Sequence, residues 1–412
     1  MTLIEFFDSK AINNVIGALL LKPERVVFIG NDRSAMESRL PYYNALLGER
    51  GIMTEMIVRS VNRNSLTATL NALEEILDTY EDCVFDIEGG DEMYLMAVGV
   101  IMAKREGIQV HRIHVQTNKI QNCDMDNHVC KAIDFDVSVK EYLMAGGGEI
   151  VYDRHEYMLT FDWHFNPELE DDIRKLWTIC ARNNFSWNRH INTLAQMSIA
   201  FNLGQSCEWS FDPELGKKYM TSNGGFYCLE LPLMRELERY GFITDLIFEE
   251  TRVSFKFRNH LIRRILTNAG QILELYVAML LRTVSKTNRD PKPYCHDVRV
   301  GVHIDWNRTD DDSLIQTVNE IDVIAMRDAV PIFISCKNGA FTVDELYKFR
   351  TVADRFGYGY AVMILVMTDP ERLGYSGDYI MTRAADMGIR VISCVHDMDE
   401  TEFTKELSMK IR

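Results

Sequence analysis

One stretch of the chain, residues 319–339, concentrates the side chains most able to do chemistry. It reads NEIDVIAMRDAVPIFISCKNG, and its apolar runs predict two strands joined by a turn around Asp328 and Ala329. Opposed residues in such a hairpin share a face, as do residues two apart. With Arg327 opposite Val330, one face collects Glu320, Asp322, Ser335 and Lys337.

Carboxylates beside a lysine suit metal-assisted hydrolysis of a phosphodiester. Glu320 and Asp322 have apolar neighbours, among which charged side chains are costly unless they are paired or bind a metal. Two carboxylates can hold Mg²⁺ or Mn²⁺ through oxygen ligands. Lys337 can steady the attacking water or the charge that develops on the phosphate. The alternative is a solvent-facing sheet edge with an ordinary ion pair.

A third carboxylate, Glu274, lies in a helix predicted over 261–285. Its segment, NAGQILELYVAML, is apolar on nearly all sides, which is typical of a buried helix. Because a buried carboxylate needs a partner, we expect Glu274 either to join the metal site or to form a buried ion pair.

The elements that must position these residues are predicted to form a third domain, over 261–412. Thr342 opens one helix, with Glu345 three residues on as a capping box. A second helix is predicted at 379–387. The predicted strands are 297–304, 319–326, 331–337, 360–367 and 389–394.

Strands and helices alternate over the first 116 residues. The strands are predicted at 24–30, 53–59, 82–87 and 108–116, and the helices at 35–48, 63–80 and 91–105. This alternation predicts a parallel, Rossmann-like sheet in a domain over 1–150, which ends near the glycines of 146–148.

Two loops that follow strands of this sheet are candidate ligand sites, because open parallel sheets bind ligands beyond the carboxyl ends of their strands. Their residues are Gly30, Asn31, Asp32, Arg33 and Ser34, and Gly89, Gly90, Asp91 and Glu92. Neither loop is a GxGxxG or a Walker A sequence, so a mononucleotide cofactor is not expected. Tight turns alone are the alternative explanation of the glycines.

A middle region, 151–260, lacks this alternation. Helices are predicted at 174–183, 188–202 and 231–240, and paired strands at 242–248 and 253–257. A helix followed by a hairpin resembles a winged helix. Residues 252–264 contain five Arg or Lys and no acid, which predicts either a phosphate-contacting patch or ordinary solvated faces.

Composition narrows the remaining possibilities. A net charge of −16 excludes nucleic-acid binding through the overall field of the protein. The nine cysteines form no CxxC pair; Cys123, His128 and Cys130 lie close together but lack an evident fourth zinc ligand. No apolar run approaches the ~20 residues of a membrane span. The first residues, MTLIEFFDSK, do not resemble an export signal, so we expect a cytoplasmic protein.

Several motifs together resemble a known family. They are IEFFD, VVFIGN, DIEGGDEMYLMAVG, AGQILELYV, NEIDVIAM and FISCKNG. They are similar to the type III CRISPR-associated ancillary nucleases, which join an N-terminal CARF sensor domain to a C-terminal PD-(D/E)XK nuclease domain of restriction-endonuclease-like α/β fold. The resemblance spans essentially the whole chain.

The resemblance implies a homodimer whose two CARF domains bind a cyclic oligoadenylate, most often cyclic tetra-adenylate. The nuclease domains would then cut DNA, RNA or both with Mn²⁺ or Mg²⁺. Glu274, Asp322 and Lys337 match the nuclease motif, and Glu320 is our addition from the hairpin register. The family has an acid two residues before the lysine, where this chain has Ser335.

Two other functions remain open at this point. One is a CARF regulator that binds DNA through its middle region and carries a degenerate nuclease domain. The other is a ring nuclease that destroys its own activator, with Asp32, Asp91 or Glu92 as the base.

Overall fold

The computed structural model describes residues 1–412 except 124–128, 153–158, 205, 288–289, 306–317 and 369–375. The chain divides into two compact units. The first comprises Met1–Phe161, Cys295–Phe333 and Lys348–Val362, and the second Asp162–Tyr294, Ile334–Tyr347 and Met363–Arg412. No helix in the described part is long and apolar enough to cross a membrane.

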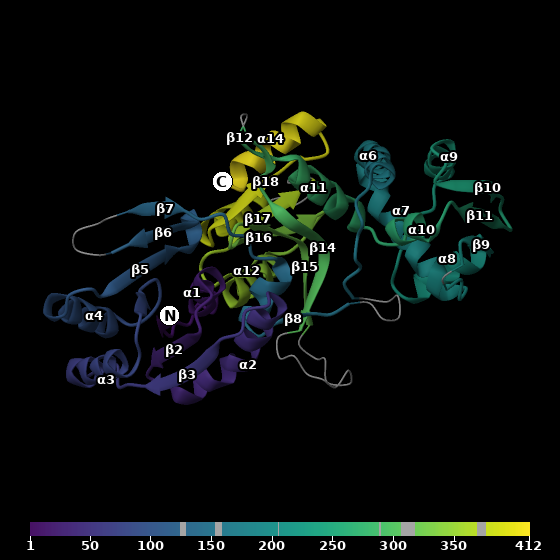
Figure 1. Cartoon of the computed structure of the whole chain (residues 1–412). Helices are drawn as coiled ribbons and strands as arrows, with labels where there is room; N and C mark the ends of the chain where they lie inside the picture. Colours follow the sequence, from purple (N-terminus) through teal and green to yellow (C-terminus); the bar gives the residue numbers. More distant parts are fainter. Residues whose placement is uncertain (124–128, 153–158, 205, 288–289, 306–317, 369–375) are drawn as a thin grey trace. The chain divides into compact units, whose positions relative to one another are not determined.

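A seven-stranded sheet lies in the first unit, in the order β3-β2-β1-β4-β5-β6-β7 (Figure 1). Its strands are β1 (Thr2–Phe6), β2 (Arg25–Gly30), β3 (Glu55–Ser60), β4 (Cys83–Asp86), β5 (Gln109–His114), β6 (Lys119–Asn122) and β7 (Cys130–Ala132). The first five strands are parallel, and β6 and β7 are antiparallel. The predicted Rossmann-like sheet is therefore confirmed.

Helices cover both faces of this sheet, because successive strand side chains point to opposite faces. Ile4 and Phe6 of β1 share a core with Leu73 and Tyr94, whereas the ring of Phe28 of β2 packs at a tilt against that of Tyr43 on the other face. Figure 1 shows α3 and α4 side by side. The helices are α1 (Asn13–Leu21), α2 (Arg33–Glu49), α3 (Leu66–Thr79), α4 (Glu92–Lys104) and α5 (Val139–Ala145), with a short 3₁₀ turn at Val115–Thr117.

A second sheet has the order β18-β17-β16-β15-β14-β8. Its strands are β8 (Glu149–Ile150), β14 (His296–Asp305), β15 (Val318–Arg327), β16 (Val330–Lys337), β17 (Val362–Met367) and β18 (Ile389–Ile392). All five strands predicted after residue 296 are present. The helices of this part are α12 (Val343–Gly357), α13 (Ser376–Asp386) and α14 (Glu400–Lys410).

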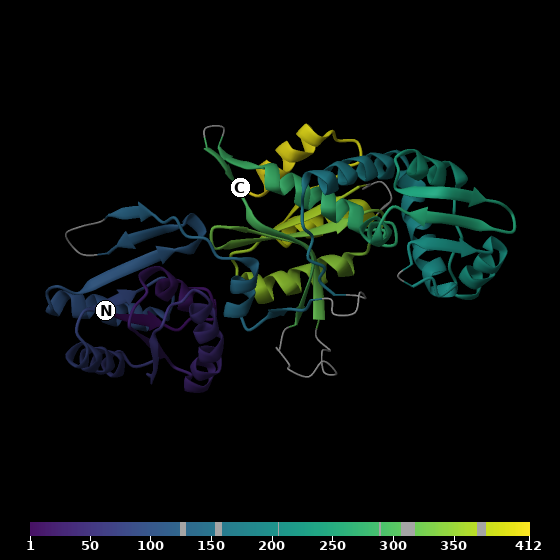
Figure 2. The same ribbon diagram turned by 45° about the vertical axis from the view of Figure 1, so that its right-hand side comes forward.

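The middle of the chain forms a helical cluster with a three-stranded sheet in the order β10-β11-β9, drawn in teal in Figure 2. The predicted helix followed by a hairpin is α9 and the antiparallel pair β10–β11. The elements are α6 (Pro167–Arg182), α7 (Asn184–Ala200), β9 (Glu208–Phe211), α8 (Pro213–Ser222), α9 (Leu231–Arg239), β10 (Ile243–Phe248) and β11 (Val253–Phe257).

The single helix predicted over 261–285 is wrong. The chain forms α10 (His260–Ile265) and α11 (Gln271–Thr283), and the strands β12 (Ser285–Thr287) and β13 (Asp290–Pro293) follow. At the break, the Gly270 N–H donates to Asn268 Oδ1 at 3.3 Å. Asparagine side chains compete in this way for backbone groups, and glycine adds conformational freedom. The helix therefore breaks here, although the apolar periodicity of the sequence continues.

Candidate active site

A two-residue turn at Asp328–Ala329 joins β15 to β16, as predicted. Asp328 has a φ of 55°, a left-handed conformation that aspartate tolerates better than most residues. The turn therefore lies where the predicted register requires it. That register, with Asp322 opposite Ser335 and Glu320 opposite Lys337, remains a prediction.

Glu320 and Asp322 lie on one face of β15, in the first unit. Ile321 and Val323 are buried, whereas Glu320 is exposed and Asp322 is half-buried. Glu320 is the register partner of His303 on β14, with 3.8 Å between Oε2 and Nε2. These two carboxylates are therefore accessible, unlike their strand neighbours.

Glu274 lies in the first turn of α11, in the second unit. Every residue of α11 from Gln271 to Leu281 is buried, as the sequence predicted for this segment. The Gln271 side chain donates to Glu274 Oε2 at 2.9 Å. A carboxylate is favoured in the first turn of a helix, because the backbone N–H groups there carry partial positive charge.

Lys337 ends β16, also in the second unit. Its backbone carbonyl accepts from the Thr368 N–H at 3.1 Å, and its Nζ lies 3.5 Å from Glu345 Oε2. Sequence reasoning identified Glu345 only as a helix cap. Glu345 lies eight residues after the lysine in the sequence, and only the fold shows that the two side chains meet.

Each of the three candidate carboxylates has, by itself, the chemistry to bind a hard divalent cation. Glu320 and Asp322 belong to the first unit and Glu274 to the second, and carboxylate oxygens are the ligands that Mg²⁺ and Mn²⁺ prefer. Within the described residues, no three His, Cys, Asp or Glu side chains are already gathered as a metal site. His128, which lies between Cys123 and Cys130 in the sequence, is outside those residues.

The two predicted ligand loops follow β2 and β4, the strands on either side of β1 in the parallel sheet. Asp32 caps α2, where its side chain accepts from Ala35 N–H at 3.0 Å. Asp91 caps α4 in the same way. Gly90 has a φ of +102°, and a Cβ there would lie 2.4 Å from Phe6 Cβ. Close packing against β1 is therefore one reason for this glycine.

The loop after β1 is a ligand-site candidate that sequence reasoning missed. In the order β3-β2-β1-β4-β5, the connections reverse direction between β1 and β4, and ligands bind at such points. Asn14 fixes this loop: its Oδ1 accepts from Asp8 N–H at 2.7 Å and its Nδ2 donates to Asp8 O at 2.8 Å.

Two buried carboxylates lie at that same point of the sheet. Glu5 on β1 and Asp86 on β4 are register partners, and both are almost fully buried. Glu5 Oε1 and Asp86 Oδ2 have no hydrogen-bond partner among the described residues. Burial raises the pKa of Asp86 to about 7. Burial, and next the charge of Asp86, raise the pKa of Glu5 well above its ordinary value.

Replacing Glu5 with glutamine is therefore expected to stabilise the protein at pH 8. The folded state holds protons on this pair that the unfolded state releases, so wild-type stability should fall as pH rises from about 4 to about 7. A glutamine amide can donate to Asp86 without a proton from solvent. Thermal unfolding of Glu5→Gln should show a higher midpoint than wild type at pH 8, by several degrees, and little difference at pH 5. The exposed Glu106→Gln is the control, and a lower midpoint for Glu5→Gln at pH 8 would contradict the assignment.

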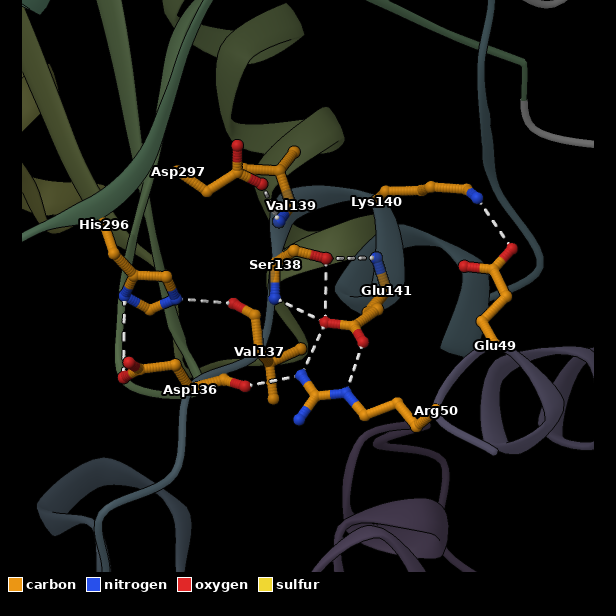
Figure 3. Close-up of polar contacts among 10 residues, drawn as sticks. All are labelled: Glu49, Arg50, Asp136, Val137, Ser138, Val139, Lys140, Glu141, His296 and Asp297. Carbon is orange, nitrogen blue, oxygen red and sulfur yellow. Dashed lines mark hydrogen bonds and ion pairs between the residues drawn. The ribbon is translucent and has the colours of Figure 1, made fainter. Parts of the chain in front are cut away.

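The far end of α2 is held to α5 and β14 by a polar network (Figure 3). Arg50 donates to both carboxylate oxygens of Glu141, at 2.5 and 2.8 Å. Burial raises the pKa of Glu141, but the hydrogen bonds from Arg50 and Ser138 outweigh it and leave that pKa lowered. The Val139 N–H, at the start of α5, donates to Asp297 of β14 at 2.7 Å. A helix that begins at a candidate ligand loop is thus linked, through the residues of α5, to β14, the strand next to β15.

The basic stretch 252–264 is largely engaged within the protein. Lys256 pairs with Glu208 at 2.7 Å, and Arg258 pairs with the buried Asp172. Arg263 donates to the Gly204 carbonyl at 2.7 Å. These contacts favour a structural role over a phosphate-binding patch.

Comparisons with known proteins agree with this architecture. Residues 260–408 match the family model of the Card1-like endonuclease domain. Can2 from Sulfobacillus thermosulfidooxidans, solved in complex with cyclic tetra-adenylate, has a TM-score of 0.67 and 16% identity, over 100% of this chain and 99% of that chain. Protein VC1899 from Vibrio cholerae has a TM-score of 0.73 and 17% identity, over 99% and 98%. No curated protein matches the sequence. Residues 260–408 thus match the Card1-like endonuclease domain, and the whole chain shares its fold with Can2 and VC1899.

Proposed function

We propose that the chain is a metal-dependent nuclease of type III CRISPR defence that a cyclic oligoadenylate switches on. The observation that carries this proposal is the match to the Card1-like endonuclease domain, since the matched residues include Glu274, Asp322 and Lys337. The whole-length likeness to Can2, solved with cyclic tetra-adenylate, supports that compound as the activator.

We assign a separate function to each of three regions of the chain. Residues 1–150 bind the activator through the loops Gly30–Ser34 and Gly89–Glu92, residues 151–260 connect, and residues 261–412 cut. The engaged arginines and lysines of 252–264 give no support to a DNA-binding regulator.

In the proposed mechanism, Glu274, Glu320 and Asp322 would hold Mg²⁺ or Mn²⁺. The metal, when bound, supplies a Lewis acid for the phosphate and a water of lowered pKa. Lys337 places its ammonium near the scissile phosphate, where it stabilises the negative charge that develops during attack. The half-buried position of Lys337 strengthens this effect, because water screens the charge less than at an open surface.

The test is a cleavage assay with the full-length chain. Plasmid DNA, single-stranded DNA and single-stranded RNA are each incubated with Mn²⁺, with and without cyclic tetra- and hexa-adenylate. Cleavage that EDTA abolishes is expected for at least one substrate. The absence of cleavage of all three, with every activator, would overturn the proposal.

We further propose that the active form is a homodimer. A two-fold symmetric cyclic ligand fits an isologous dimer with the binding site on the symmetry axis. Light scattering at micromolar concentration should therefore give about twice the 47.6 kDa chain mass, even without activator. A clean monomer with and without ligand would exclude this arrangement.

A further inference from the structure

One buried threonine contacts each of the three residues at which β16 ends. Thr368 lies directly after β17 and is 1% exposed. Its N–H donates to the Lys337 carbonyl at 3.1 Å. Its hydroxyl donates to Asn338 Oδ1 at 3.2 Å and accepts from the Gly339 N–H at 3.1 Å. The single hydroxyl proton and one of the oxygen lone pairs are therefore both engaged by the segment that carries Lys337.

Two helices of the middle region contact the same segment. The Asn188 side chain, on α7, donates to the Asn338 carbonyl. The Asn338 side chain in turn donates from Nδ2 to Cys180 Sγ, on α6, at 3.5 Å. All of these residues belong to the second unit. The peptide that follows Lys337 is thus held from β17, α6 and α7 together.

These contacts matter for a lysine because its charge must be placed accurately. An ammonium stabilises a transition state only from the right position, and a displacement of ~1 Å can lower a rate by about a hundredfold. The lysine side chain is a flexible four-carbon stem, so it cannot supply that accuracy by itself. The backbone from which the stem starts must then be fixed, and Thr368 contacts that backbone on Lys337 and on Gly339.

We propose that Thr368 is a positioning residue of the nuclease site. Its hydroxyl holds Asn338 and Gly339 so that the Lys337 ammonium meets the scissile phosphate. This inference rests on the proposed nuclease function, and it adds a residue that acts through Lys337 rather than on the substrate. A hydroxyl with a purely structural role would instead stabilise the fold and leave the rate of the folded protein unchanged.

The experiment compares two variants of the full-length chain with wild type. Thr368→Val keeps the shape of the side chain and removes both hydroxyl contacts, whereas Thr368→Ser keeps the hydroxyl. Both are assayed with Mn²⁺ and saturating cyclic tetra-adenylate at a temperature at which every variant is folded. We expect kcat to fall by about ten- to a hundredfold in Thr368→Val, with KM changed less than about twofold, because the lysine acts on the transition state. Thr368→Ser should recover most of kcat.

Thr193→Val is the matched control. Thr193 on α7 is also fully buried. Its hydroxyl likewise accepts from one N–H, that of Cys228 at 3.0 Å, and donates to one oxygen, the Arg189 carbonyl at 2.8 Å. The substitution therefore removes the same two kinds of hydrogen bond from residues other than 337–339. It should lower the thermal midpoint about as much as Thr368→Val does, and leave kcat within about twofold of wild type.

Hydrogen exchange supplies a measurement that does not depend on cleavage. The Gly339 N–H loses its acceptor in Thr368→Val, so a peptide that spans residues 337–341 should exchange faster than in wild type. Thr193→Val should leave this exchange unchanged. An unchanged rate in Thr368→Val would show that the hydroxyl does not hold the segment, and would overturn the inference.

The cleavage results separate this inference from the proposed function. Wild-type cleavage that Thr368→Val leaves intact would overturn the role of Thr368 and leave the nuclease proposal standing. Equal losses of kcat in Thr368→Val and Thr193→Val would also overturn it, because the hydroxyl would then serve only the fold. A wild-type chain that cleaves nothing would overturn the proposed function and this inference with it.

Discussion

Replacing Lys337 with alanine is expected to lower the rate of phosphodiester cleavage by about two orders of magnitude or more. The substitution removes the ammonium that stabilises developing charge on the phosphate, and single electrostatic groups of this kind contribute about 10²–10³ in rate. The fold should survive, because Lys337 ends its strand and its contact with Thr368 uses the backbone. The measurement is the initial rate of plasmid cleavage with Mn²⁺ and cyclic tetra-adenylate.

The control for this variant is Lys175→Ala. Lys175 is also paired with a carboxylate, at 2.6 Å from Asp171, but it lies on the exposed face of α6. This variant should cleave like wild type. If Lys337→Ala kept full activity while remaining folded, Lys337 would have only a structural role and the assigned nuclease site would be wrong.

The sequence predicted regular elements where their local signals were strong. The strands β2 to β5 and the helices between them come from apolar runs separated by turn residues. The first strand was missed because Glu5 interrupts its apolar pattern, and only the fold shows this acid to be buried against Asp86. The β6–β7 hairpin was missed because β7 is exposed along its length and has no apolar face to recognise.

The candidate site, too, was predictable only in part. The hairpin turn at Asp328–Ala329 was predictable, because two tightly connected strands have few possible arrangements. The contact between Lys337 and Glu345 was not, because it depends on where α12 begins relative to β16. The approach of Glu5 to Asp86 likewise joins residues about eighty positions apart, which no local pattern reports.

Cyclic tetra-adenylate is expected to raise the cleavage rate at least about tenfold. A ligand can shift a conformational equilibrium only by the difference in its affinities for the two states, and a tenfold shift needs roughly 1.4 kcal/mol. Two connections within the first unit can carry that difference away from the parallel sheet. One is α2, from its cap at Asp32 to the Arg50–Glu141 pair. The other is Tyr360, just beyond α12, whose hydroxyl donates to Asn13 Oδ1 at 3.1 Å.

The ratio of cleavage rates with and without this activator tests the central claim most directly. Full-length chain, Mn²⁺ and one substrate that it cleaves are held constant, cyclic tetra-adenylate is titrated from zero to saturation, and Lys337→Ala is measured alongside to exclude a contaminating nuclease. An activator-gated nuclease predicts a saturable rise of tenfold or more that the variant does not show. Equal rates at every concentration of cyclic tetra-adenylate, and of the other ring sizes, would contradict it.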